Sequence, residues 1–509
     1  MKSERLFPAM MMAMVMAVLT PASATARQVL SGHVPEVVAR LHLQPPGRLA
    51  GTNQLALAIG LPLRNREALT NLLQQLYDPA SANYHHYLTP AQFAAKFGPT
   101  ELDYQAVIAF VRQNGFAVTG THPNRTLLDV RGSVADVERT LHVRINRYQH
   151  PTENRTFFAP DLEPSLDLAV PVLNVSGLDD FIQPRPLNLT KPRNQQIGAT
   201  ALGVGVAMPA TGSAPGGGFM GNDFRAAYVP GVTLTGSGQT VGLVEFNSGF
   251  YSDDITAYES QAGLPNVPVT PVLINGYDGS PGVANLEISL DIEMALSMAP
   301  GLDQILVYEG ALPDDVLNCI ATNDVAKQIS ASWGYSTDAA TEQIYQQFAA
   351  QGQSFFNASG DGDAWLGPVY CGSCEDPNIT IVGGTTLTTS GPGGAWVSES
   401  VWNWGSDSWY AWNPDGDFGS SGGISTDVSI PAWQQGVNMS ANHGSTTMRN
   451  LPDVALTADN VYVIYDNGSK TSSGGTSAAA PLWAGFTALV NEQALASGRP
   501  RARIWFRFS

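Results

Sequence analysis

The chain has 509 residues, of which 43% are hydrophobic, and it carries a formal net charge of −18 at pH 7. This length allows more than one domain with a substantial core. The negative charge argues against nucleic acid or an anionic membrane surface as a partner. With 51 glycines and 34 prolines, the composition indicates a loop-rich globular protein and excludes a coiled coil.

Residues 1–26 have the pattern of a secretory signal. Two basic residues precede an apolar run over about residues 9–19, and small residues follow up to Ala24 or Ala26. The alternative is a membrane anchor, but the run is too short to span a bilayer. We therefore predict a secreted or extracytoplasmic protein that has no membrane association once the signal is removed.

Basic residues divide the chain. Residues 1–200 hold 18 of the 26 Lys and Arg, whereas residues 201–498 hold only four. Helical patterns cover 64–76, 90–97 and 103–114, and strand patterns cover 126–130 and 143–148. We predict a small α+β domain over 27–185. A linker over 186–218, rich in Gly, Ala and Pro, would follow it and contain a processing site.

Residues 219–509 alternate buried strands with helices. The strand-like segments are GQTVGLVEF, DQILVYEG, KQISASWG, GQSFFNAS and ITIVGGT. This order predicts an α/β domain in which helices cover both faces of a parallel sheet. Ligands of such sheets collect at the carboxyl ends of the strands.

The stretch SSGGTSAAAP, residues 472–481, reads like the nucleophile loop of a serine peptidase, with Ser477 as the nucleophile. A serine nucleophile normally uses a histidine as its base. The one histidine beyond residue 150 is His443, in a polar stretch that reads better as a solvated loop. A subtilisin-type site is therefore the weaker interpretation, and another base is needed.

Carboxylates can supply that base. Residues 285–300, NLEISLDIEMALSMAP, alternate like a strand, but their length and the stop at Pro300 favour a helix. On a helix, Glu287 and Asp291 lie on one face within an apolar surround, where carboxylates are costly unless paired or used. A surface acidic face is the alternative. Asp361 follows the strand-like GQSFFNAS, although an ordinary Asp-Gly turn would explain it too.

In this order the motifs resemble the sedolisins, or serine-carboxyl peptidases, over almost the whole chain. The stretch YDPASANYHHYLTPAQFAAKFGPT, residues 77–100, resembles their activation domain. The catalytic part has their E-x-x-x-D, S-G-D and G-T-S-x-x-x-P motifs, and the segments ISASWG, IVGGT and SSGGIS also match. The resemblance implies a subtilisin-like parallel sheet flanked by helices, with a ferredoxin-like pro-domain.

The resemblance also implies an acid-acting serine-type endopeptidase, with tripeptidyl-peptidase action left open. It implies an acyl-enzyme on Ser477 and Glu287 as the general base. Asp291 would share a proton with Glu287, and a protonated Asp361 would stabilise the oxyanion. Glu245 would support this pair as a neighbouring carboxyl.

Substrate and partners follow from the same resemblance. Ser332, Trp333 and Gly334 would lie along the strand that binds protein or peptide substrates. The pro-domain would act as an intramolecular inhibitor of a zymogen. We expect a monomer and no nucleic-acid partner.

The three cysteines are Cys319, Cys371 and Cys374. In an oxidising compartment the last two are expected to form a local disulfide, and a redox-active pair is the alternative. The pairing of Cys319 stays open.

The family implies a calcium site after the Ser477 helix. Residues 482–509 contain one acidic residue, Glu492, whereas calcium takes about six to eight oxygen ligands. We therefore expect a truncated carboxyl-terminal part and no metal or other cofactor bound by this chain. The alternative function is a catalytically impaired or non-enzymatic secreted relative.

Overall fold

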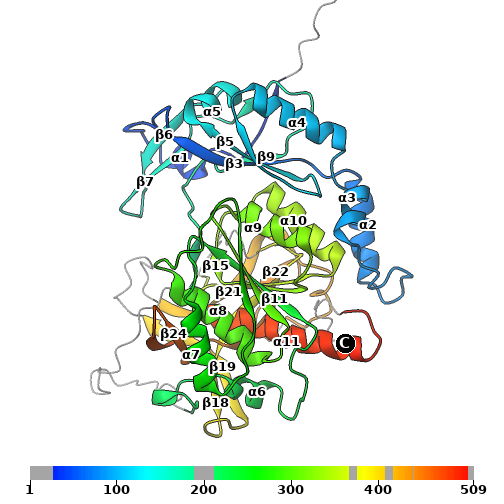
Figure 1. The fold of residues 1–509 in the computed structure, drawn as a ribbon, viewed down its shortest axis with the longest axis vertical. Helices are drawn as coiled ribbons and strands as arrows, with labels where there is room; N and C mark the ends of the chain where they lie inside the picture. The colour runs from blue at the N-terminus through cyan, green and yellow to red at the C-terminus, as the bar shows by residue number, and fades with distance from the viewer. Residues whose placement is uncertain (1–26, 188–210, 366–374, 407–416, 440, 502–509) are drawn as a thin grey trace, which may run out of the picture.

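A computed structural model of the protein describes residues 27–187, 211–365, 375–406, 417–439 and 441–501. The predicted signal, most of the predicted linker, and both Cys371 and Cys374 lie outside these residues. Within them, none of the helices is long and apolar enough to cross a membrane. Figure 1 shows the amino-terminal part, in blue and cyan, stacked on one side of a larger carboxyl-terminal part.

The amino-terminal part is built on a four-stranded antiparallel sheet. Its order is β4 (Ala117–Thr121), β5 (Leu127–Ser133), β3 (Gln54–Gly60) and β9 (Asn174–Ser176). Helices α4 (Glu101–Gln113) and α5 (Val134–Leu141) pack on it through a core that includes Leu57, Val107 and Val137. The predicted α+β architecture is therefore present in this part of the chain.

Smaller elements complete the amino-terminal part. They are β1 (Gln28–Val29), α1 (Glu36–Arg40), β2 (Gly47–Arg48), α2 (Arg66–Leu76), α3 (Pro90–Lys96), β6 (Ile145–Gln149), β7 (Thr156–Pro160) and β8 (Ser165–Leu166). The helix α3 begins with a capping box in which Thr89 and Gln92 bind each other's backbone N–H. Thr89 is therefore the N-cap of α3.

An eight-stranded sheet forms the centre of the carboxyl-terminal part. Its order is β12 (Val269–Leu273), β13 (Gln304–Gly310), β11 (Thr240–Phe246), β14 (Gln328–Ala331), β16 (Ser354–Ala358), β18 (Thr380–Thr389) and β19 (Trp396–Val401), with β23 (Val454–Thr457) also paired to β18. All neighbours run parallel except β19, which is antiparallel to β18. The predicted parallel sheet is confirmed.

Helices cover both faces of this sheet. On one face α8 (Asn285–Met298) and α11 (Thr476–Ala496) share a core with Leu243 of β11. On the other face α9 (Pro313–Asn323) and α10 (Ala339–Gln351) share a core with the next residue, Val244. The alternation of side chains along β11 thus separates the two layers. The shorter helices α6 (Asn222–Tyr228) and α7 (Ser252–Ala262) also contact α8.

The ambiguous segment 285–300 is a helix, α8, and every residue from Glu287 to Met298 is buried. It lies between the sheet, α11 and α7, and β24 (Val461–Tyr465) also contacts it. Apolar residues on all sides of the helix are explained by this complete enclosure.

Several strands lack a clear pattern in the sequence. They are β10 (Arg185–Pro186), β17 (Gly362–Ala364), β20 (Asn403–Ser406), β21 (Asp417–Ser429), β22 (Met448–Leu451) and β25 (Ser469–Ser473), whereas β15 (Trp333–Gly334) lies within the strand-like KQISASWG. Their segments are rich in Gly, Ser and Asn, which are poor strand formers, so cross-strand pairing rather than intrinsic preference forms them. Of these, β21 pairs with β17, β20 and β22.

The amino-terminal sheet docks on α9 and α10, as Figure 1 shows. Ala58 and Leu127 of the sheet pack against Ala340 of α10. Nearby, the Leu63 N–H donates to Gln343 Oε1 at 2.7 Å. The amino-terminal part therefore covers this helical face of the larger part.

Candidate active site

Ser477 is the second residue of α11 and is fully buried. The chain turns into this helix at Gly475, whose φ of +154° lies at the edge of the region that glycine reaches most easily. Its N–H donates to the Ala458 carbonyl at 2.7 Å, which fixes the turn. The glycine of the G-T-S motif thus sets the position of the serine.

The two carboxylates predicted on α8 lie one turn apart beside this serine. The pKa of Glu287 is raised well above its ordinary value, first by burial and then by the charge of Asp291, and the nearby Ser477 side chain partly offsets the rise. Burial also raises the pKa of Asp291, while hydrogen bonds from Ser332 and Glu245 oppose this change. Two such neighbours cannot both ionise, so the pair holds a proton.

Glu245 extends this pair into a cluster of three carboxyls. It lies near the carboxyl end of β11, and Trp333 Nε1 donates to its Oε2 at 2.8 Å. Burial and then the charge of Asp291 raise the pKa of Glu245 well above its ordinary value. The position predicted for Glu245 is therefore next to Asp291, and the indole of Trp333 holds it there.

Asp361 follows the end of β16 and lies at the first residue of the nucleophile helix α11. The N–H and the hydroxyl of Thr476 both donate to Asp361 Oδ1, each at 2.8 Å. Oδ2 is buried and has no hydrogen-bond partner among the described residues. Burial raises the pKa of this carboxyl to about 7, so the protonated acid can donate from Oδ2.

The segment SSGGIS of β21 holds the Asp361 loop. The Ser421 N–H donates to the Gly360 carbonyl at 2.8 Å, and Ser421 Oγ accepts the Gly362 N–H at 2.9 Å. Gly419 N–H donates to the Asp361 carbonyl at 3.2 Å. Sequence reasoning noticed this segment but gave it no role, because the contacts join positions about 60 residues apart.

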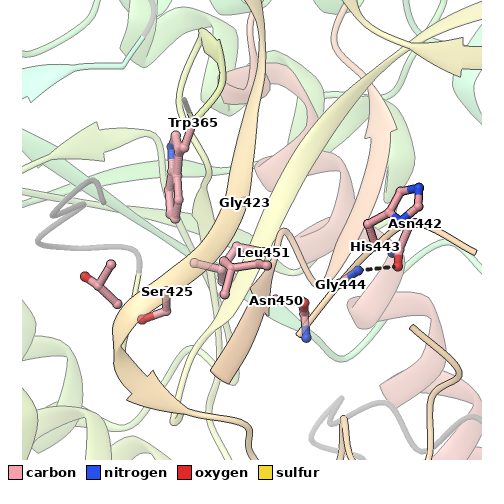
Figure 2. A pocket seen from close by; sticks show the side chains of 10 residues that line it. Trp365, Gly423, Ser425, Asn442, His443, Gly444, Asn450 and Leu451 are labelled. Atoms are coloured by element: carbon pink, nitrogen blue, oxygen red, sulfur yellow. Dashed lines mark hydrogen bonds between the residues drawn. The ribbon is translucent and has the colours of Figure 1, made fainter. Parts of the chain in front are cut away.

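Further along β21 the strand borders a cavity of about 650 Å³, shown in Figure 2. The Trp365 indole covers Gly423, where an added Cβ would lie 3.0 Å from the ring. His443 lines the far side of the cavity from an exposed loop, and Ser477, Glu287 and Asp361 do not line it. The histidine is thus an exposed loop residue, as the sequence favoured.

The predicted substrate strand, residues 332–334, lies at the same site, but two of its side chains point toward the buried carboxyls. Backbone of β10 pairs with β15, matching Arg185 to Gly334, and the Leu187 N–H donates to the Ser332 carbonyl at 2.9 Å. The side chains of Ser332 and Trp333 instead face the buried carboxyls, which residue spacing alone did not reveal. Only the backbone of this strand is left to bind an extended chain.

The remaining site predictions concern cysteines and calcium. Cys319 lies on α9 and is a free thiol, and burial raises its pKa to about 11. In the described part of the chain, no group of three or more His, Cys, Asp or Glu side chains could hold a metal ion. The expectation that this chain binds no calcium stays a prediction.

Comparisons with known proteins agree over most of the chain. Residues 42–181 match the family model "Pro-kumamolisin, activation domain". Xanthomonalisin from Xanthomonas sp. (strain T-22) is 29% identical over 90% of this chain, which spans 60% of the length of that relative. Sedolisin from Pseudomonas sp. (strain 101) is also 29% identical, over 91% of this chain and 80% of its own.

Among solved structures, a Pseudomonas sedolisin, a serine-carboxyl proteinase complexed with two molecules of pseudo-iodotyrostatin, matches with a TM-score of 0.48 and 27% identity. That match covers 55% of this chain and 82% of the other. The activation-domain match covers the amino-terminal part, whereas the two relatives match about nine-tenths of the chain. Together these similarities support a sedolisin-family peptidase that carries a pro-kumamolisin activation domain.

Proposed function

We propose that this protein is a secreted, acid-acting serine-carboxyl endopeptidase that cleaves protein or peptide substrates through an acyl-enzyme on Ser477. The observation that carries the proposal is the buried cluster at the start of α11, where Glu287 and Asp291 lie near Ser477 and Asp361 binds Thr476. Export rests on the signal-like residues 1–26.

In the first step Glu287 takes the hydroxyl proton of Ser477 while Oγ attacks the substrate carbonyl carbon. Asp291 stabilises the protonated Glu287 by sharing its proton. The carbonyl oxygen becomes an oxyanion, and Asp361 donates to it from Oδ2. Glu287 then gives its proton to the leaving amine, and the C–N bond breaks. Water attacks the acyl-enzyme by the same sequence in reverse and releases Ser477.

Acid pH suits these groups because both Asp361 and the Glu287–Asp291 pair must hold a proton. Asp361 can donate only when protonated, and burial raises its pKa to about 7. The Glu287–Asp291 pair must hold one shared proton, so that Glu287 can act as the base while Asp291 is its hydrogen-bond partner. Activity should therefore fall as the pH rises through the pKa of Asp361.

The activation domain supports a zymogen in which this domain inhibits the site in cis. Its last described residues, Arg185 and Pro186, pair with the backbone edge of Trp333 and Gly334. An extended substrate would need the same edge, so the two should compete. A self-processing step in the segment after Leu187 would then open the site. We propose a monomer, because the inhibitor lies in the same chain.

The test is to incubate the full chain with an unfolded protein at about pH 4 beside two variants, Ser477→Ala and Glu287→Gln. Wild-type cleavage that both variants lose supports the proposal, and internal cleavage products distinguish an endopeptidase from tripeptide release. Cleavage that survives in Ser477→Ala would contradict it. A wild-type chain that never cleaves favours the catalytically impaired or non-enzymatic relative, which is the second candidate.

A further inference from the structure

Pro481 removes the helical hydrogen bond that the backbone carbonyl of Ser477 would otherwise accept. In a regular helix the Ser477 carbonyl would accept the N–H of the residue four positions later, which is residue 481. Pro481 lies inside α11 and has no N–H, and a proline ring also crowds the carbonyl four residues before it. Because Ser477 is fully buried, its carbonyl needs a different donor.

Ser332 supplies that donor from outside the helix. Its Oγ donates toward the Ser477 carbonyl oxygen at 3.2 Å and toward Asp291 Oδ1 at 2.8 Å. Ser332 is fully buried and lies between β14 and β15, where the sheet meets α8 and α11. One hydroxyl therefore lies between the nucleophile's backbone and the carboxyl that shares a proton with the base.

We propose that Ser332 is a positioning residue for the nucleophile, whose hydroxyl replaces the helical hydrogen bond that Pro481 removes and joins the Ser477 backbone to Asp291. The inference rests on the proposed function, and it differs from a role of Ser332 in binding substrate. The part of Ser332 that pairs with an extended chain is its carbonyl, which accepts the Leu187 N–H and which a side-chain substitution leaves in place.

The hydroxyl has one proton and two acceptors. While Asp291 is ionised, the charged carboxylate is the stronger acceptor and draws the proton of Ser332. When Asp291 holds a proton, the hydroxyl can donate fully to the Ser477 carbonyl. The protonation of Asp291 is thereby coupled to the placement of the nucleophile.

A double-mutant cycle on the full chain tests the inference. It compares wild type, Ser332→Ala, Pro481→Ala and the double variant, with kcat and KM measured on a peptide substrate at about pH 4. Ser330→Ala is the matched control, because Ser330 is a buried serine on the adjoining strand β14 whose hydroxyl has no partner among the described residues. Thermal melting of each variant reports whether it is folded.

We expect Ser332→Ala to lower kcat by about tenfold to a hundredfold and to change KM by less than about twofold. Ser330→Ala should keep kcat within about twofold of wild type. Pro481→Ala restores an N–H that can bind the Ser477 carbonyl, so in that background Ser332→Ala should cost no more than about threefold.

A rise in KM without a fall in kcat would assign Ser332 to substrate binding and overturn the inference. So would a loss that is undiminished in the Pro481→Ala background, or one that Ser330→Ala reproduces. If Ser332→Ala does not fold, Ser332→Cys takes its place, since it keeps the volume with a weaker donor. A wild-type chain whose cleavage does not depend on Ser477 overturns the proposed function first, and this inference with it.

Discussion

Asp361 is the residue that ties the site most directly to pH. Two donors of Thr476 bind Oδ1 and leave Oδ2 without a partner among the described residues. The proton of the neutral acid therefore belongs on Oδ2, the atom free to face an oxyanion. Burial raises the pKa to about 7, so this donor is present in acid and is lost as the pH rises through that value.

The substitution Asp361→Asn should keep a hydrogen-bond donor at this position and remove the dependence of that donor on pH. An amide can place its NH₂ where Oδ2 stands and keeps Oδ1 for Thr476, but it donates at every pH. We expect about tenfold lower kcat in acid, and a ratio of variant to wild-type kcat that rises as the pH passes through 7. A ratio that falls over the same range would contradict the assignment of Asp361 as a protonated donor.

At the scale of elements, β21 controls the loop that carries Asp361. Ser420 and Ser421 are neighbours on this strand, and each hydroxyl accepts one backbone N–H, from Gly384 and Gly362 respectively. Of these two amides, only that of Gly362 is next to Asp361 in the chain.

Replacement of Ser421 by Ala should therefore lower kcat by about tenfold, because the Asp361 loop loses the hydrogen bond from the Gly362 N–H to Ser421 Oγ. Ser420→Ala is the matched control, and it should change kcat by less than about threefold. Steady-state kinetics on the two purified variants, with melting temperatures as the check on folding, provide the comparison. Equal losses in both variants would mean that β21 acts through general stability.

The helix α8 carries a further carboxyl away from the nucleophile. Both oxygens of Glu293 accept the Ile464 N–H of β24 at 3.2 Å, and the side chain is fully buried. Burial, and then the charge of Asp254, raises its pKa well above the ordinary value. Such a group is protonated when folded and ionised when unfolded at neutral pH, so it destabilises the fold as the pH rises above the unfolded pKa.

Glu293→Gln removes this penalty and keeps an oxygen to accept the Ile464 N–H. The variant should melt at least about 2–4 °C above the parent at pH 7 and within about 1 °C of it at pH 4. The Ser477→Ala chain is the suitable parent, because it cannot cleave itself. A larger gain in melting temperature at pH 4 than at pH 7 would show that the pKa of Glu293 is not raised by folding.

At the scale of the whole molecule, carboxyls lie at the interface between the activation domain and the larger part. Ser176 Oγ of β9 donates to Asp314 at 2.6 Å and to Asp338 at 2.8 Å, at the amino ends of α9 and α10. Burial, and then the charge of Asp338, raises the pKa of Asp314 to about 8. The neighbouring Asp315 also has a raised pKa, because of burial and the nearby Asp129 of β5.

These raised pKa values give docking a definite dependence on pH. The docked form binds more protons than the separated form, so docking is strongest in acid and weakens as the pH rises toward 8. Acid by itself should then tighten this interface, and release of the activation domain should follow cleavage of the connecting segment.

We expect hydrogen exchange in α9 and α10 of the Ser477→Ala chain to be slower, relative to intrinsic rates, at pH 5 than at pH 8. Asp315→Asn cannot ionise, so it should reduce that difference. Faster relative exchange at pH 5 than at pH 8 would refute the predicted direction.

The sequence by itself determined the elements and the chemistry of the motifs. Short apolar runs located β11, β13, β14, β16 and β18, because strands of a covered parallel sheet are buried on both faces. Apolar periodicity located α2, α3 and α4, because burial on one face leaves a repeat in the chain. The resemblance to the sedolisins pointed to Ser477, Glu287 and Asp361 through the G-T-S, E-x-x-x-D and S-G-D motifs. It agrees with the cost of burying a carboxylate that is neither paired nor used.

Only the tertiary structure decided which of these groups meet, and how. The ambiguous segment 285–300 became a helix because the sheet, α7 and α11 enclose it. The side chains of Ser332 and Trp333 turned toward Asp291 and Glu245, and Asp129 came to face Asp315 across the docked domains. Periodicity reports whether a side chain is buried but not what it is buried against, because that depends on contacts between residues far apart in the chain.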